Sequence, residues 1–371
     1  MAGGGNLVVT VSPHIKSPET TGSIMRLVLL GLLPATLWAC VLFGISGIAV
    51  IAISVITALF CEVTWHNLRD GKGTGRTWFA LVSSLVVPIG VSAAGLGRAA
   101  PAAAIALMSA FILSEAGISR QGERRHSFDG SAAVTGLLLA LVLPPLVPWW
   151  IPFVGAFIAI WLGKEIFGGL GYNVFNPALV ARAILVLSWP AHLTAGWFRS
   201  LGIDATSKAT PLMLAKTGAA ADLTAYYAPL LLNNPGGCIG EVSAFLLLVG
   251  GAMLLWKRVI TWEIPVTYLG AMAVASVLMG VDPVFHLLAG GAVLGAVFMA
   301  TDYVTSPVSS RGKIVFGIMC GAITMLLRVY SKAPEGVTSA ILFMNMVTPL
   351  IDRSTMPRPF GVVRAGRGVR K

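Results

Sequence analysis

The sequence predicts an all-α, polytopic membrane protein of about ten transmembrane helices, and its composition, apolar runs and basic loops all support this fold class. Of its 371 residues, 56% are hydrophobic and only 11% are charged, whereas a soluble globular chain carries roughly 25% charged residues. The mean hydropathy is +0.84. The 42 glycines and 21 prolines also suit transmembrane helices better than soluble ones. This composition disfavours a water-soluble enzyme.

Long apolar runs give the expected spans, because a helix needs roughly 20 apolar residues to cross the hydrocarbon core. Runs of that kind lie at 24–43, 45–61, 78–96, 100–118, 131–147, 238–256, 262–280, 285–300, 313–328 and 337–351. A further pair, 150–163 and 177–190, is shorter and is separated by a glycine-rich segment. This pair either spans the membrane or enters it and returns, and both choices keep the two chain ends on one side.

The basic residues predict the orientation of the chain, since cytoplasmic loops carry an excess of Lys and Arg. Four basic turns fall on one side of the predicted topology: 62–77, 119–130, Lys257-Arg258, and Arg311 with Lys313. The tail after Asp352 is also basic. We therefore expect both termini in the cytoplasm, and we attribute the net charge of +11 to these loops and not to a nucleic-acid partner.

The expected spans divide the chain into five parts with one sizeable external segment. These are a cytoplasmic segment 1–23, a first bundle half 24–190, an external loop 191–237, a second bundle half 238–351 and a basic cytoplasmic tail 352–371. Pro148-Trp149-Trp150-Ile151-Pro152 in the first half is echoed by Thr261-Trp262-Glu263-Ile264-Pro265 in the second. An odd number of crossings separates the copies, which predicts inverted repeats with broken or re-entrant helices. Chance combined with interfacial tryptophan anchoring is the alternative.

Local motifs exclude several chemistries. The four cysteines form no CxxC pair and the five histidines are scattered, so neither a zinc site nor an iron–sulfur ligand set is assembled by local spacing. The sequence contains no recognisable motif for a phosphate-binding loop or for a nucleophile–base pair. The segment 168–171, followed by Asn173, Asn176 and Pro177, is either a broken helix that exposes backbone dipoles or a tight packing turn.

Ionisable residues within apolar segments are candidates for ion movement, because charges inside a membrane are costly and mark functional sites. The strongest candidates are Glu115, Asp302, Glu165 and Asp352, and Lys164, Arg182 and Glu241 also qualify by position. The alternative for each is an interfacial charge that snorkels at a helix end.

An ordered series of motifs between about residues 12 and 352 resembles the D subunit of the Rnf (Rsx) ion-translocating electron-transport complex. The series comprises Ser12-Pro13-His14, Asp129-Gly130-Ser131, Phe167-Gly168-Gly169-Leu170-Gly171, Phe175-Asn176-Pro177-Ala178, Ser207-Lys208-Ala209-Thr210-Pro211, Gly240-Glu241, Ala300-Thr301-Asp302-Tyr303-Val304-Thr305-Ser306-Pro307, Pro334-Glu335-Gly336 and Pro349-Leu350-Ile351-Asp352. The B subunit of the sodium-pumping NADH:quinone reductase shares most of these motifs. That relative typically has a longer N-terminal extension, so we prefer the Rnf subunit.

The resemblance implies a redox-driven ion pump of the ferredoxin:NAD⁺ oxidoreductase type, in the bacterial inner membrane, with no complete active site in this chain alone. It further implies FMN joined through its phosphate to Thr210, within the motif that starts at Ser207 and follows Asp204. Lys208 departs from the glycine that is usual there: its ammonium could pair with the flavin phosphate, or it could hinder the transferase that installs the flavin. Riboflavin, held noncovalently among the helices, is the second implied cofactor.

The implied partners are a second subunit with covalent FMN and iron–sulfur subunits, and the implied coupling ion is H⁺ or Na⁺. Without the resemblance, the same features fit a cofactor-free channel or transporter with inverted repeats. Read by itself, Thr210-Pro211 predicts a helix start, with a hydroxyl N-cap and proline in the first turn.

Overall fold

The computed structural model describes residues 20–69, 83, 102, 105–106, 108–110, 112, 129–195, 211–216, 223–233, 236–331 and 336–356. Within these ranges every regular element is a helix, which confirms the all-α class. Three helices in the described part are long and apolar enough to cross a membrane: α1 (Thr21–Arg69), the stretch Trp150–Phe167, and α14 (Ser310–Tyr330). The number of spans stays a prediction.

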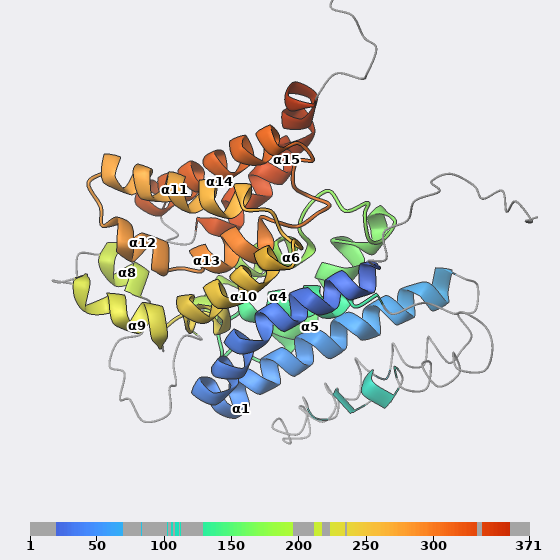
Figure 1. The fold of residues 1–371 in the computed structure, drawn as a ribbon. Coiled ribbons are helices and arrows are strands. Elements are labelled where there is room, and N and C mark those ends of the chain that lie inside the picture. Colours follow the sequence, from blue (N-terminus) through green and yellow to red (C-terminus); the bar gives the residue numbers. More distant parts are fainter. Residues whose placement is uncertain are drawn as a thin grey trace, which may run out of the picture.

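Helix α1 is a hairpin of two helical arms. At Gly44 the backbone has φ 59° and ψ −140°, a conformation open to glycine but costly for residues with a Cβ. Figure 1 shows the two arms lying side by side in blue. The break confirms the predicted boundary between the runs 24–43 and 45–61. The second arm continues to Arg69, so the first turns of the predicted loop 62–77 are helical instead.

Two other predicted spans are interrupted. The run 131–147 is α-helical only in α4 (Ser131–Leu141). The run 285–300 is divided among α12 (Pro283–Leu288), α13 (Ala292–Leu294) and the π-helix η5 (Gly295–Met299). Both α4 and α13 follow a glycine with positive φ, 81° at Gly130 and 65° at Gly291. These breaks confirm the expectation of broken helices, while the inverted repeat itself stays a prediction.

The remaining helices complete two packed groups. They are α5 (Trp150–Phe157), the π-helix η1 (Ile158–Leu162), the 3₁₀-helix η2 (Glu165–Phe167), α6 (Pro177–Ser188), α7 (Pro190–Ala195), α8 (Pro211–Lys216), η3 (Thr224–Tyr226), α9 (Tyr227–Leu232), η4 (Ile239–Glu241), α10 (Ala244–Trp256), α11 (Glu263–Leu278) and α15 (Val337–Thr355). Helix α1 packs against α4, α5 and α10, while α14 packs between α11 and α15. In Figure 1 the α1 group and the α11 group lie on opposite sides, with α6, α10 and α13 between them.

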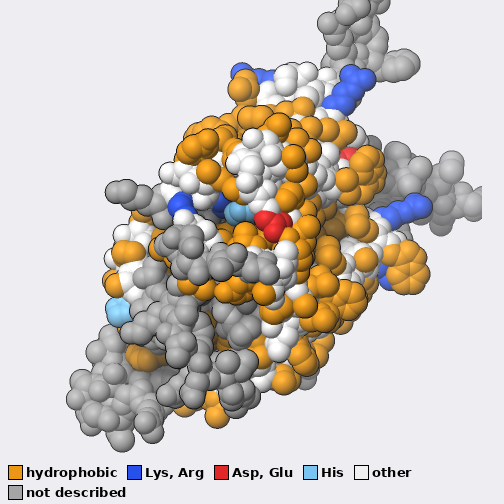
Figure 2. All heavy atoms as spheres, turned by 90° about the vertical axis from the view of Figure 1, so that its left-hand side faces the viewer, with side chains coloured by type: hydrophobic (Ala, Val, Ile, Leu, Met, Phe, Trp, Pro, Cys, Tyr) orange, Lys and Arg blue, Asp and Glu red, His pale blue; other side chains and the backbone are white. Residues whose placement is uncertain are grey.

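Small residues allow the helices to approach closely, as is usual between membrane helices. A Cβ atom built on Gly136 of α4 would lie 2.8 Å from the carbonyl oxygen of Ser54 in α1. The outer surface is strongly apolar: Ile45, Leu187 and Leu278 are 87%, 83% and 82% exposed. Figure 2 shows hydrophobic side chains over most of the described surface on one face. Such a surface requires lipid or other apolar partners as its surroundings, so the chain is a membrane protein.

A polar cavity between broken helices as the candidate functional site

A cavity lies where the two halves of the chain meet. It encloses about 760 Å³, with open space at its mouth included. The first half contributes the starts of α1 and α4 and the irregular segment from Lys164 to Pro177, and the second half contributes η5 and the residues up to Tyr303.

Asn176 joins the two halves at the cavity wall. Its Oδ1 accepts hydrogen bonds from the backbone N–H groups of Ala178 (3.1 Å) and Leu179 (3.4 Å), so it caps α6. Its Nδ2 donates to the carbonyl oxygen of Met299 at the end of η5, at 3.3 Å. Gly168, Gly169 and Gly171 before Asn176 all have positive φ, so the chain turns here without a helix, which fits both predicted readings of 168–171.

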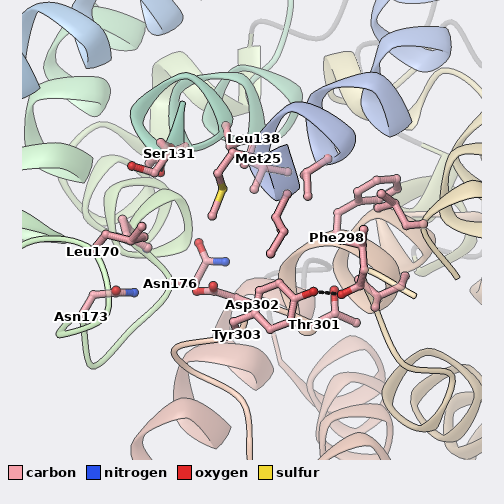
Figure 3. A pocket seen from close by; sticks show the side chains of 18 of the residues that line it. Met25, Ser131, Leu138, Leu170, Asn173, Asn176, Phe298, Thr301, Asp302 and Tyr303 are labelled. Carbon is pink, nitrogen blue, oxygen red and sulfur yellow. Dashed lines mark hydrogen bonds between the residues drawn. The ribbon is translucent and has the colours of Figure 1, made fainter. Parts of the chain in front are cut away.

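Asp302 and Asn173 form a second contact between the halves. The two side chains interact, and the Asp302 carboxylate also accepts from Thr305 Oγ1 at 3.2 Å. In Figure 3, Asn173, Asn176 and Asp302 point toward the same part of the cavity. Amide and carboxylate groups from both halves thus meet at one side of the space.

The buried Asn345 amide on α15 holds the backbone next to these polar groups. With the Asn345 amide oriented to satisfy its neighbours, its oxygen accepts from the Asn176 N–H at 3.1 Å and its nitrogen donates to the carbonyl of Thr305 at 3.3 Å. Thr348 Oγ1 donates to the same carbonyl at 3.1 Å. Because these groups are buried and hydrogen-bonded, the positions of Asn176 and Asp302 are fixed by packing.

The rest of the cavity wall is mostly apolar. Met25, Leu138, Leu170 and Phe298 line it from four separate elements, as Figure 3 shows. Tyr303 also lines it and donates its hydroxyl hydrogen to the carbonyl of Val259. The site therefore combines apolar walls with a few placed polar groups, which is the usual composition of a cofactor pocket.

Each half carries a π-helix that ends beside this cavity. The π-helix η1 ends at Leu162, just before the lining residue Lys164, and η5 ends at Met299, just before the lining residue Thr301. π-Helical turns are rare and occur frequently at functional sites, since they re-aim the side chains that follow.

Lys164 belongs to a buried network at the cavity edge. Its Nζ lies 2.5 Å from Glu62 Oε1 and 2.7 Å from Ser131 Oγ. Ser131 Oγ in turn donates to Asp129 Oδ1 at 2.7 Å. The side chains of Lys164 and Glu62 are only 4% and 8% exposed, so this ion pair is largely removed from water.

A smaller pocket is lined by two other predicted intramembrane charged residues, Arg182 and Glu241. They line it together with Cys238, close to the break at Gly290 and Gly291. Arg182 Nη1 donates to Cys238 Sγ at 3.5 Å, and the Cys238 thiol donates to the carbonyl of Val142 at 3.0 Å. This pocket is separate from the larger cavity in its lining residues.

The structure separates the predicted ion-path residues. Asp302 lines the cavity, and Glu165 lies behind the lining residue Lys164, whose Nζ is 3.6 Å from Glu165 Oε1. Asp352 does not line the cavity, and its Oδ1 accepts from the Val308 N–H at 3.1 Å. The remaining predicted site residues lie outside the described part of the chain: Glu115, Asp204, Ser207, Lys208 and Thr210. Helix α8 does begin at Pro211, as predicted.

Sequence reasoning missed Glu62. The predicted span ended at residue 61, which left Glu62 in a loop, whereas it lies in the helix and is buried. The spacing of Trp65 and His66 from Glu62, at three and four residues, was the available signal, because such positions share a helix face.

The fold and the cavity define a class: a helical membrane protein whose broken helices from two halves enclose a largely apolar cavity with a few polar groups. A statistical model of the NQR2, RnfD, RnfE family matches residues 8–95 and 76–361. The chain belongs to this family.

Full-length relatives specify the branch of the family. The chain is 40% identical over 360 residues to the D subunit of the Na⁺-translocating ferredoxin:NAD⁺ oxidoreductase complex of Acetobacterium woodii, with 97% of this chain and 96% of the relative covered. It is 36% identical over 372 residues to the D subunit of the proton-translocating ferredoxin:NAD⁺ oxidoreductase complex of Clostridium ljungdahlii, with 96% of each covered. These matches confirm the resemblance to the Rnf D subunit.

Proposed function

We propose that this chain is the D subunit of an Rnf-type complex and that it relays electrons through bound flavin while the complex moves a cation across the inner membrane. The observation that carries this proposal is the end-to-end match to the D subunits of two ferredoxin:NAD⁺ oxidoreductase complexes. One of these relatives is named for Na⁺ and the other for protons, so the proposal specifies a cation that is either Na⁺ or H⁺.

The proposed electron carrier is FMN in phosphoester linkage to Thr210. Thr210 provides a hydroxyl at the last position of the motif Ser207-Lys208-Ala209-Thr210, and α8 begins directly after it. Lys208 places a cation two residues from the linkage, where it would pair with the phosphate, and Asp204 lies in the same segment. A covalent carrier cannot dissociate, which suits a relay between subunits.

The proposed site of the second flavin, riboflavin, is the cavity between the halves. Its residues fit this group: the amides of Asn173 and Asn176 offer donors and acceptors, and Phe298 and Leu170 offer apolar surface. When bound, a flavin supplies one-electron and two-electron chemistry, and the protein supplies position and electrostatics. Asn176 would be held rigid toward it, because its amide is already anchored to α6 and η5.

The Asp302 carboxylate and the amides of the cavity would couple electron movement to cation movement. Asp302 carries the acidic group of the cavity lining, and its carboxylate interacts with Thr305 and Asn173. A carboxylate at this depth attracts a cation or a proton, since it is partly withdrawn from water. The expected partners are the remaining subunits of the complex, including another with covalent FMN and others with iron–sulfur clusters.

Two rival functions make different predictions. The B subunit of a sodium-pumping NADH:quinone reductase belongs to the same family and would copurify with quinone reductase activity. A cofactor-free channel or transporter would contain no flavin. Quinone reductase activity of the purified complex distinguishes the first rival, and acid treatment followed by gel separation of the subunits distinguishes the second. We expect covalent flavin on this chain and free riboflavin in the acid supernatant, whereas flavin in neither fraction would contradict the proposal.

The basic turns predict the orientation, with both termini in the cytoplasm and 191–237 outside. A cysteine introduced at residue 220 of a chain that lacks its four native cysteines should react with a membrane-impermeant maleimide added to intact cells. A cysteine at residue 365, in the basic tail, is the matched control and should react only after the membrane is broken. The reverse pattern would overturn the orientation.

Replacing Asp302 by asparagine should reduce redox-driven cation uptake into vesicles at least tenfold while flavin content stays at the wild-type level. The reason is that asparagine keeps the shape and the contact with Asn173 but removes the charge that attracts a cation. Asp352→Asn is the matched comparison, because Asp352 lies outside the cavity lining. Equal loss of uptake in both variants would contradict a specific role for the cavity.

A further inference from the structure

We propose that Glu62, His66 and Glu165 bind one divalent transition-metal ion at the edge of the cavity. Glu62 and His66 lie one helical turn apart on the second arm of α1, and Glu165 lies in η2. One ligand atom from each of the three side chains lies within 4.8 Å of the others. This proposal is independent of the flavin sites proposed above.

Glu165 carries the observation that points to a ligand. Its side chain is only 1% exposed, yet within the described part of the chain neither carboxylate oxygen has a hydrogen-bond partner. The neighbouring charge is the Lys164 ammonium at 3.6 Å, which is itself engaged more closely by Glu62 and Ser131. Buried carboxylate oxygens are normally satisfied by hydrogen bonds or by metal ions, because leaving them unpaired is costly.

The charged side chains around Glu62 and Glu165 also favour binding of a cation. Glu62 and Glu165 are paired with one ammonium, that of Lys164, and the Asp129 carboxylate adjoins the same network through Ser131. Within the described residues, these three carboxylates and one ammonium leave two negative charges when all four are ionised and His66 is neutral. One divalent ion would neutralise them at a place where the side chains of Glu62 and Glu165 are buried.

The donor set selects the kind of ion. Two carboxylates and one imidazole suit Mn²⁺, Fe²⁺ or Zn²⁺, whereas Ca²⁺, Mg²⁺ and Na⁺ favour oxygen ligands alone. Ligand distances of about 2.1 Å would draw the three donor atoms to about 3 Å from one another. The His66 side chain is only partly buried, which gives the ion a route of entry. Lys164 would remain bonded to Glu62 Oε1 and orient that carboxylate, in the manner of outer-sphere partners.

Bound metal would fasten the end of α1 to the segment that carries Lys164, which lines the cavity. The test uses the purified full chain in detergent after dialysis against a chelator, and the probe is Mn²⁺, counted by the loss of its free electron paramagnetic resonance signal. We expect one Mn²⁺ per chain, displaced by Zn²⁺ and not by excess Na⁺.

Glu165→Gln and His66→Gln should each weaken Mn²⁺ binding by at least about tenfold, while helix content and gel-filtration profile stay unchanged. His192→Gln is the matched control, since the exposed His192 packs on Trp150 away from the cluster. Absence of saturable Mn²⁺ binding to the wild-type chain, or unchanged binding in both cluster variants, would overturn the site. Flavin content is measured on the same samples, so loss of flavin with metal binding intact refutes the proposed function alone.

Discussion

Replacing Thr210 by alanine is expected to remove in-gel flavin fluorescence from this chain completely and to stop electron transfer through the complex. The attachment needs a hydroxyl oxygen to form the bond to phosphorus, and alanine has none. The chain should still insert and fold, because even the loss of a helix cap at this position costs only about 1 kcal/mol.

Two further variants provide controls for this result. Ser207→Ala keeps Thr210 and should retain covalent flavin, while Thr210→Ser keeps the oxygen and should be partly modified, because serine lacks the methyl group that restricts the threonine rotamer. If the Thr210→Ala chain still fluoresced, the attachment site would be wrong, and Ser207 or Thr206 would be tested next.

Replacing Lys164 by methionine is expected to destabilise the chain strongly, by about 3–5 kcal/mol, because it leaves a buried carboxylate without its partner. Lys164 and Glu62 are in contact at 2.5 Å with side chains 4% and 8% exposed. The measurement is the unfolding midpoint of the purified chain in detergent with a chelator present, which keeps metal from compensating. Lys257→Met is the matched control: Lys257 is exposed above the Trp256 ring, so its loss should change the midpoint little.

A second variant shows whether the loss comes from the unpaired charge. Adding Glu62→Gln to Lys164→Met should recover part of the stability, since the double variant no longer buries a lone carboxylate at this contact. Equal midpoints for the wild-type and Lys164→Met chains would show that the pair contributes nothing. A double variant less stable than Lys164→Met would show that Glu62 acts through other contacts.

The sequence predicts the parts of the fold that depend on local chemistry. Gly44 separates two apolar runs and is the residue at which α1 turns back. Pro211 follows a hydroxyl residue and begins α8. In both cases one residue type restricts or frees the backbone at that position. The turn or helix start can therefore be predicted from the local sequence.

Hydropathy alone did not locate the breaks inside the runs 131–147 and 285–300, because it measures transfer into an apolar medium and does not report whether a helix continues. The local signals at these breaks are Pro144-Pro145 and Gly290-Gly291. These breaks are stable only where other parts of the protein satisfy the freed backbone groups. The Arg328 side chain does so for the carbonyls of His286, Ala289 and Gly290.

The candidate site depends on pairs far apart in the chain. Glu62 and Lys164 are separated by 102 residues, and Asn176 and Met299 by 123. The sequence marks Asn173, Asn176 and Asp302 individually as polar groups within apolar surroundings. Only the packing of the two halves places them around one cavity, so their shared role was not readable from spacing.

The intact mass of the wild-type chain, purified from cells that express the whole complex, tests the central claim most directly. We expect the chain to be heavier than its sequence by one FMN less one water, with the added mass on the peptide that contains Thr210. A chain at its unmodified sequence mass would contradict the account, because the proposed relay depends on a flavin that stays attached to this protein.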